Sequence, residues 1–306
     1  MPWIPGLFLA AGLAVHAGPP AVLSEPAAAF AAQVREVRRQ PGFIEYEVRF
    51  PSALKSRFPS NDTVWAHFSV PVGAKGPVPC IVVLPVMAAP NIWIEQRFIN
   101  RFRKDGFAVL WLEMPYQFHR RPDPSMPSGQ VFLARTAPKL AANFRQSVLD
   151  ARRALTWLSK HPAVDPRRIG LFGTSLGGMV GSVVYSVDPR PRYAVFLLAG
   201  ADFPSLAQSS SMTRPFMRRA GIDAESLRRA WRGIDPLDYM ESNKTKKALL
   251  INCLWDLVIP KANALKLFEA FPAARQVWLP LGHYSAILHL LWIPRYISAD
   301  FIEALK

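Results

Sequence analysis

The chain has 306 residues, of which 50% are hydrophobic and 19% charged, a composition typical of a globular protein and not of a disordered one. At this length, one α/β domain with insertions is a better prediction than two independent domains. The formal net charge is +15, but the lysines and arginines are scattered and form no nucleic-acid-binding motif. We therefore expect no nucleic-acid partner, and we interpret the charge as a solvated surface that favours anionic partners or membrane surfaces.

The cysteines and the acidic residues predict neither a disulfide framework nor a metal site. Cys80 and Cys253 each lie inside an apolar run, which is typical of buried free thiols. No group of His, Cys, Asp and Glu has the spacing of a metal site, and no phosphate-binding loop with its lysine occurs. The sequence therefore predicts no metal and no cofactor.

Residues 1–40 are expected to precede the folded domain as an apolar segment and a linker. Residues 3–15 are apolar and residues 15–17 resemble a cleavage site, yet no Lys or Arg comes before them. The run is also shorter than the ~20 residues of a membrane span. An atypical signal peptide, a membrane-surface anchor and an arm packed on the domain remain as alternatives, so a cytoplasmic location is as open as export or membrane association.

The strand patterns change along the chain. Residues 43–50 and 64–70 form two strand-like runs, and the first alternates between apolar and charged positions, which predicts a half-exposed antiparallel hairpin. The later strands are continuous apolar runs, which fit parallel strands covered on both faces. These runs are residues 80–84, 107–112, 169–172, 193–198, 248–251 and 277–281.

Helical patterns lie between the strands. In residues 140–160, apolar residues recur at spacings of three and four, and the pattern ends before Pro162. The helix pattern at residues 285–302 is expected to break near Pro294. The expected helices are residues 92–104, 140–160, 262–271 and 285–302. Together these patterns predict an α/β fold in residues 41–306, with an eight-stranded, mostly parallel, doubly wound sheet.

A long insertion separates two of the parallel strands. Residues 203–245 are polar, basic and mostly helical, with Asp223 as the expected N-cap of a helix, and they are too many for an ordinary loop. Ligands bind at the carboxyl edge of such a sheet, where this insertion begins. We therefore interpret it as a small helical lid, with a pair of surface helices as the alternative.

The motif GTSLGG at residues 173–178 stands between a strand pattern and a helix pattern. Gly-x-Ser-x-Gly in this setting is typical of a nucleophile elbow, in which the serine occupies a strained turn and the glycines let the strand and the helix approach. Ser175 is therefore the candidate nucleophile. The alternative is a glycine-rich loop without chemistry, so a base and an acid are needed to decide.

His283 and Asp256 meet that need. A serine hydroxyl requires a neighbouring imidazole, and His283 follows Gly282 on a loop after an apolar strand, whereas His67, His161 and His289 lie in strand or helix patterns. Asp256 comes just after the preceding strand, where it can orient the base; Asp202 is the reserve acid. The order Ser, Asp, His is that of α/β-hydrolases.

On the motifs at residues 165–178, 256–260 and 282–283, residues 43–306 resemble the α/β-hydrolase superfamily, nearest to its dienelactone-hydrolase-like and acetyl-esterase-like branches. The resemblance implies a serine hydrolase that cleaves a small-molecule carboxylic ester through an acyl-enzyme intermediate. A peptidase or amidase on the same triad is one alternative, although peptidase relatives usually carry a larger cap or a propeller, and this chain leaves no room for a propeller. A non-catalytic binding protein on the same fold is another.

The resemblance also implies an oxyanion hole. Superfamily members usually take one N–H from the residue after the nucleophile, here Leu176, and another from a His-Gly loop after the third strand. The corresponding loop, residues 84–90, lacks His-Gly. A backbone donor does not depend on its side chain, so Met87 is the expected second donor and Val86 the alternative.

One further loop is expected at the carboxyl edge. Residues 113–122 follow the fourth strand, and we expect Tyr116, His119 and Arg120 to contact the substrate, with Arg120 or Arg121 able to hold a carboxylate or phosphate. The alternative is a surface loop with solvated arginines.

Overall fold

A computed structural model describes residues 21–24 and 29–306. The apolar run at residues 3–15, with its interpretations as signal peptide, anchor or arm, lies outside the described residues. Within the described part, no helix has both the length and the apolar character needed to span a membrane.

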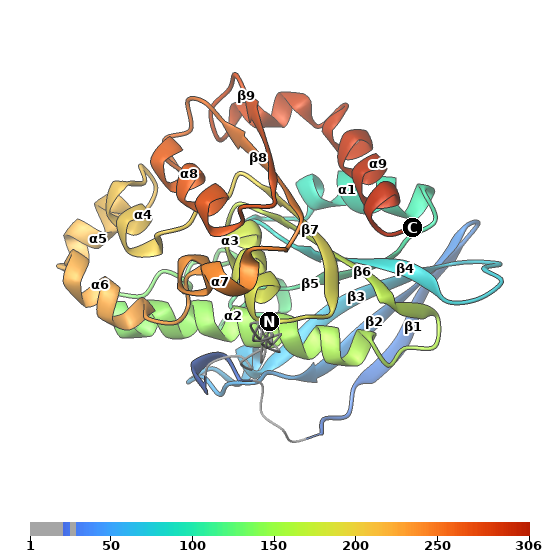
Figure 1. Ribbon diagram of the computed structural model, residues 1–306. Helices are drawn as coiled ribbons and strands as arrows, with labels where there is room; N and C mark the ends of the chain where they lie inside the picture. Colours follow the sequence, from blue (N-terminus) through green and yellow to red (C-terminus); the bar gives the residue numbers. More distant parts are fainter. Residues whose placement is uncertain (1–20, 25–28) are drawn as a thin grey trace, which may run out of the picture.

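A nine-stranded sheet forms the centre of the fold, in the order β1-β2-β3-β5-β4-β6-β7-β8-β9 (Figure 1). The first three strands and β5 pair antiparallel, and the pairs from β5 to β9 are parallel. The strands are β1 (Gln33–Gln40), β2 (Phe43–Pro51), β3 (Thr63–Pro71), β4 (Val78–Leu84), β5 (Ala108–Leu112), β6 (Val164–Thr174), β7 (Pro191–Leu197), β8 (Ala248–Cys253) and β9 (Arg275–Leu279). The predicted mostly parallel α/β sheet is confirmed.

The expected number of eight strands is wrong by one, because β1 lies in the segment that we expected to be a linker. It pairs antiparallel with β2, from Gln33 opposite Arg49 to Gln40 opposite Phe43. Nearly all of its residues are exposed and most are charged or polar, so it has no apolar face by which a strand is recognised. The sheet therefore begins before residue 41.

Helices cover both faces of the sheet (Figure 1): α1 and α9 pack together on one face, and α2 and α3 lie on the other. They are α1 (Trp93–Lys104), α2 (Ala137–Leu158), α3 (Leu176–Val187), α4 (Phe203–Ser209), α5 (Arg214–Ala220), α6 (Ala224–Trp231), α7 (Met240–Asn243), α8 (Lys261–Ala270) and α9 (Ile293–Ala304). In β4, Val82 belongs to the core under α2 and α3, and Val83 to the core under α1 and α9. Because both faces are buried, β4 and β5 consist almost entirely of apolar residues.

Short 3-10 helices complete the chain: η1 (Ala21–Leu23), η2 (Pro59–Asp62), η3 (Phe118–Arg120), η4 (Pro236–Tyr239) and η5 (Ser285–His289). The last predicted helix is broken as expected, into η5 and α9, and Pro294 lies in the first turn of α9, where its missing N–H is tolerated. Cys80 and Cys253 are both free and buried, as predicted.

The insertion at residues 203–245 contains α4, α5, α6, η4 and α7. In Figure 1 its first three helices, coloured yellow to orange, extend beyond the sheet, and α6 packs against α2. Asp223 caps α6 as predicted, since its side chain accepts a hydrogen bond from the Ser226 N–H at 2.7 Å. The insertion is therefore a packed helical unit attached to the core.

Candidate active site

Ser175 lies in a tight turn between β6 and α3, with φ +52° and ψ −114°. A positive φ is uncommon for a residue other than glycine and marks local strain. A Cβ atom at Gly177 would lie 2.0 Å from the Leu84 carbonyl oxygen, and one at Gly173 would lie 2.2 Å from the Gly177 oxygen. Only glycine at both positions lets α3 begin so close to β4 and β6, so the predicted nucleophile elbow is present.

Ser175, His283 and Asp256 lie in one line of contacts. The Ser175 Oγ and the His283 Nε2 are 3.2 Å apart, and the His283 Nδ1 lies 2.7 Å from the Asp256 Oδ2. The other Asp256 oxygen accepts hydrogen bonds from the N–H groups of Val258 at 2.8 Å and Ile259 at 2.7 Å. The carboxylate is therefore fixed with one oxygen facing the imidazole, and this line of contacts can pass a proton from the serine to the histidine.

The reserve acid, Asp202, does something else. Its side chain caps α4 by accepting a hydrogen bond from the Ser205 N–H at 3.3 Å. The imidazole of His283 instead faces Asp256. The geometry therefore selects Asp256 over Asp202 as the partner of the histidine.

In the loop after β4, side chains bind both the N–H and the carbonyl group of Val86. The Val86 N–H donates to the Glu95 Oε1 at 2.9 Å, and its carbonyl accepts from the Gln117 Nε2 at 2.8 Å. Within the described part of the chain, no hydrogen bond uses the N–H of Met87. Leu176 is the first residue of α3, so its N–H also has no partner inside the helix.

Glu95 and Gln117 were not expected to take part in the site. Glu95 is fully buried in the first turn of α1, and this burial raises the pKa of its carboxyl group. Glu95 shares a helix face with Phe98, Ile99 and Phe102. An acidic residue on an apolar helix face could have been recognised in the sequence as a candidate for a buried role. Gln117 lies in an irregular loop, where no pattern marks it.

An apolar pocket lies beside Ser175. Its empty space is about 610 Å³, including some that is open to solvent, and Met87 and Leu176 are among the residues that line it. Among the residues that the structure describes, no charged side chain lines this pocket. The insertion contributes Phe203, Leu206, Ala207, Met212, Met217 and Trp231 to its wall. The insertion thus covers the apolar space next to the candidate nucleophile.

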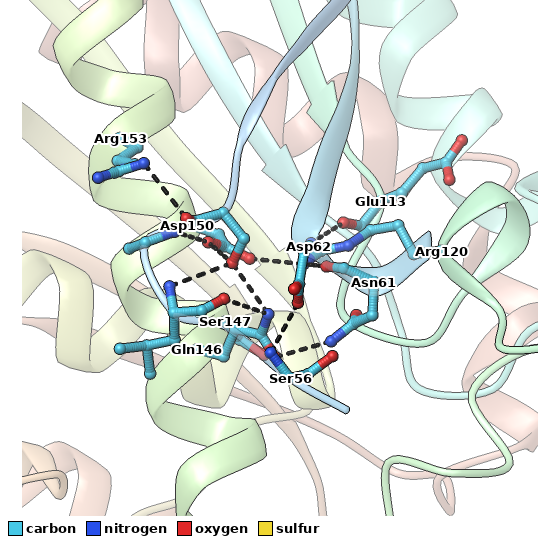
Figure 2. Close-up of polar contacts among 12 residues, drawn as sticks. Ser56, Asn61, Asp62, Glu113, Arg120, Gln146, Ser147, Asp150 and Arg153 are labelled. Carbon is cyan, nitrogen blue, oxygen red and sulfur yellow. Dashed lines mark hydrogen bonds and ion pairs between the residues drawn. The ribbon is translucent and has the colours of Figure 1, made fainter. Parts of the chain in front are cut away.

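Arg120 is not a substrate contact, contrary to expectation. Its side chain is fully buried, and the Nη2 atom lies 2.7 Å from the Asp150 Oδ2 and 2.8 Å from the Asn61 carbonyl oxygen (Figure 2). Asp150 also accepts from the Ser52 hydroxyl at 2.7 Å. The loop turns inward because the guanidinium completes this buried polar network.

The expectations for Tyr116 and His119 fail as well. Tyr116 is fully buried, and its hydroxyl donates to the Asn143 Oδ1 at 3.2 Å. The His119 ring stacks on Trp65, with 4.1 Å between ring centroids, and its Nδ1 lies 2.7 Å from the Glu113 Oε1. None of the three predicted contacts lines the pocket beside Ser175 in the described structure.

A model of the prolyl oligopeptidase family matches residues 141–293, which is half of the chain. The chain belongs to the prolyl oligopeptidase family. The matched region contains Ser175, Asp256 and His283. This prolyl oligopeptidase family member is therefore a serine hydrolase on an α/β-hydrolase fold.

Relatives in sequence match part of the chain. An α/β-hydrolase domain-containing protein of Arabidopsis thaliana, WAV2, is 28% identical over 152 residues, which is 47% of each protein. An uncharacterised protein of Mycobacterium tuberculosis is 28% identical over 161 residues, 52% of this chain and 38% of that protein. The match spans less than half the length of these relatives.

Solved structures with the same fold include an esterase and a peptidase. The acetyl xylan esterase from Paenibacillus sp. R4 superimposes with a TM-score of 0.69 and 21% identity over 89% of each chain. The acylaminoacyl peptidase of Pyrococcus horikoshii has a TM-score of 0.65 and 16% identity, over 87% of this chain and 42% of that one. These structures confirm the α/β-hydrolase fold that the motifs predicted.

Proposed function

We propose that this prolyl oligopeptidase family member hydrolyses carboxylic esters with Ser175 as nucleophile, His283 as base and Asp256 as the acid that orients it. The observation that supports the proposal most is the continuous line of contacts from the Ser175 Oγ through the imidazole to the buried carboxylate, at 3.2 and 2.7 Å. In this arrangement His283 takes the proton of Ser175 while the Oγ attacks the ester carbonyl. Asp256 stabilises the imidazolium that forms.

The N–H groups of Leu176 and Met87 hold the oxyanion of the tetrahedral intermediate. Val86 is the poorer candidate, because its N–H is already engaged by Glu95. Each correctly placed donor contributes roughly 3 kcal/mol to the stability of the transition state. His283 then returns its proton to the departing alcohol, and a water molecule, activated by the same histidine, releases the acyl group from Ser175.

The pocket supports an ester with an apolar acyl group over a peptide. A buried peptide needs partners for each of its N–H and carbonyl groups, since an unpaired buried polar group costs about 1–3 kcal/mol. The wall beside Ser175 consists mainly of apolar side chains, such as those of Phe144, Met179 and Met217. An alkyl or aryl acyl group larger than acetyl fits this wall, and a small-molecule ester is the substrate class that we propose.

The test compares p-nitrophenyl esters from acetate to palmitate with the p-nitroanilide of the best acyl group. We expect ester hydrolysis with an optimum beyond acetate, and a loss of at least about 10⁴-fold in kcat for Ser175→Ala. The control is Ser242→Ala, an exposed serine on α7.

Two results would change the proposal. Faster cleavage of the anilide than of the ester would favour a peptidase or amidase on the same triad. No activity on any ester, together with no labelling of Ser175 by a fluorophosphonate probe, would favour a non-catalytic binding protein.

A further inference from the structure

Large apolar side chains are exposed on the two loops that hold Asp256 and His283. Leu257 is 73% exposed and Leu291 is 84% exposed. Trp255 and Tyr284, next in sequence to Asp256 and His283, are each about two-thirds exposed or more. We call this set the apolar rim, which comprises Trp255, Leu257, Tyr284, Leu288, Leu291 and Trp292.

The two loops lie side by side. The Trp255 N–H donates to the Leu281 carbonyl at 2.9 Å, which joins the loop after β8 to the loop after β9. The Leu257 carbonyl accepts from the Ser211 N–H at 2.8 Å, which joins the rim to the turn before α5. The rim therefore borders His283, Asp256 and the insertion that covers the pocket.

The composition of the rim suits a lipid surface. Single exposed apolar residues are normal, but a group of six on adjoining loops marks an interaction surface. Trp and Tyr have an apolar body and a polar edge, and both are enriched where proteins meet lipid headgroups. The Trp292 Nε1 donates to the His289 Nδ1 at 3.0 Å, so this indole is held in place at the surface.

The charges around the rim favour an anionic partner. Residues 253–262 and 281–299 contain one acidic residue, Asp256, whose side chain is buried against His283. The exposed charged residues in these segments are Lys261 and Arg295. The adjoining α5 adds three exposed arginines, Arg214, Arg218 and Arg219.

This arrangement argues against a second copy of the chain as the partner. Two rims facing each other would bring these cations together, in a protein whose net charge is already +15. Anionic lipid headgroups would instead attract each Lys or Arg that comes near the surface.

We propose that the apolar rim docks on the surface of an anionic lipid bilayer. In the docked state Trp255, Leu291 and Trp292 enter the headgroup region, and Lys261, Arg295 and the arginines of α5 face the lipid phosphates and carboxylates. Val258 and Ile259, which follow Leu257 in the chain, line the pocket beside Ser175, so the docked bilayer lies close to that pocket. Docking requires no catalysis, so it can be tested apart from ester hydrolysis.

The experiment is co-sedimentation of the full chain with vesicles of phosphatidylcholine alone or mixed with phosphatidylserine. The wild-type protein is expected to bind the mixed vesicles more tightly, and to bind less tightly as salt is added. Leu291→Glu is expected to weaken this binding at least about tenfold. It removes an apolar side chain that enters the headgroup region on docking, and it adds a negative charge that the anionic lipids repel. Ser175→Ala is expected to bind like the wild type.

Val72→Glu is the matched control, because Val72 is half-exposed and lies just after β3, whose end is at the opposite edge of the sheet. It changes the net charge equally and is expected to leave binding unchanged. Leu288→Glu is a second rim variant in case Leu291→Glu fails to fold, which thermal unfolding of each protein would show.

Three results would overturn the proposal. The first is equal vesicle binding by the wild type, Leu291→Glu and Leu288→Glu, which would assign the contact to another part of the chain. The second is no preference of the wild type for phosphatidylserine. The third is a wild-type dimer that dissociates in both rim variants while binding is unchanged, which would make a second copy the occupant of the rim.

Discussion

Both polar backbone groups of Val86 are bound by side chains from other elements, Glu95 from α1 and Gln117 from the loop after β5. Its peptide groups cannot turn toward a ligand without breaking these contacts. The Met87 N–H belongs to the same peptide unit as the Val86 carbonyl, so the contact with Gln117 also fixes the direction of this N–H, the donor that we propose for the oxyanion. A loop without the usual His-Gly can in this way acquire a defined geometry from its surroundings.

Gln117→Leu is expected to lower kcat by about tenfold to a hundredfold with little change in KM. The reason is that a small displacement of the Met87 N–H weakens a contact made in the transition state more than one made in the ground state. Steady-state kinetics on the best p-nitrophenyl ester measures the effect.

Three variants control this experiment. Gln130→Leu changes an exposed glutamine and is expected to match the wild type. Glu95→Gln keeps an acceptor for the Val86 N–H and should stay near wild type, whereas Glu95→Leu should behave like Gln117→Leu. An unchanged kcat in Gln117→Leu and Glu95→Leu would show that these side chains do not position the loop.

Asp256→Asn is expected to lower kcat by about 10⁴-fold. The N–H groups of Val258 and Ile259 keep the amide oxygen, so the amide NH₂ faces the His283 Nδ1 and favours the wrong tautomer of the imidazole. Asp202→Asn is the matched control. It replaces one good N-cap residue with another and should retain activity. If the Asp202 variant lost more activity than the Asp256 variant, the assignment of the acid would have to be reversed.

The sequence was sufficient to predict that Ser175, Asp256 and His283 lie together, because each lies in the turn or loop after a strand and the carboxyl ends of parallel strands share one edge. It was not sufficient for Arg120. The partners of that side chain, Asp150 on α2 and Asn61 in η2, are far away in sequence, and no local pattern shows that the loop turns inward.

At the scale of the elements, α6 separates two spaces. Trp231 at its end lines the apolar pocket beside Ser175 and also an outer groove that Arg228, Arg232 and Asp235 line. The indole is nearly buried and packs near Phe144, with 6.4 Å between ring centroids. Trp231 is therefore a wall between the apolar pocket beside Ser175 and the outer groove.

Trp231→Ala is expected to shift the preference toward longer acyl chains, because it opens the pocket to the outer groove. Each additional buried methylene contributes up to about 0.8 kcal/mol, roughly fourfold in kcat/KM. The measurement is the ratio of kcat/KM between long and short p-nitrophenyl esters, which does not depend on the fraction of folded protein.

Trp231→Phe keeps a ring at the wall and should keep the wild-type preference. Trp93→Ala removes an exposed tryptophan on α1 and should also leave it unchanged. The same ester ratio in the wild type and Trp231→Ala would exclude this wall as the limit on acyl length.

The elements differ in how well the sequence predicts them. The helices over α1, α2 and α8 were predicted to within a few residues, because apolar spacing on one helix face determines them. β1 was missed because its neighbour β2, and not its own composition, decides its pairing. An edge strand with charged side chains on both sides has no local signature of burial.

At the scale of the whole molecule, buried ion pairs join elements on one side of the sheet. Asp188 follows α3, and its oxygens lie 3.1 Å from the Arg152 Nε on α2 and 2.8 Å from the Arg190 Nε just before β7. Burial opposes ionisation of Asp188, but the hydrogen bonds and charges of Arg190 and Arg152 outweigh it, so its pKa lies below the usual range.

This lowered pKa predicts a pH dependence of stability. The unfolded chain binds the proton of Asp188 more readily than the folded one, so the contribution is fully present above the unfolded pKa of about 3.9 and is lost as the pH falls through the folded pKa. Asp188→Asn is expected to destabilise the protein by about 3–5 kcal/mol at pH 7, since it removes the negative charge that faces the buried Arg152, and by less in acid.

Urea unfolding of the two proteins at neutral and at acidic pH measures this difference. Asp123→Asn is the control, because Asp123 is an exposed carboxylate whose pKa is also lowered, by hydrogen bonds from Ser125. It should change the free energy of unfolding little at either pH. An equal loss of stability for Asp188→Asn at both pH values would contradict the ionic origin of the effect.

The two carboxylate oxygens of Asp256 make contacts with different parts of the site. One oxygen faces the imidazole of His283, and the other holds Val258 and Ile259, which line the apolar pocket beside Ser175. Substitutions at Val258 or Ile259 that reshape the pocket for a new substrate are therefore expected to disturb the contact between Asp256 and His283 as well. The walls contributed by Met217 and Trp231 have no such link, so they are the places where substrate preference can be altered while turnover is preserved.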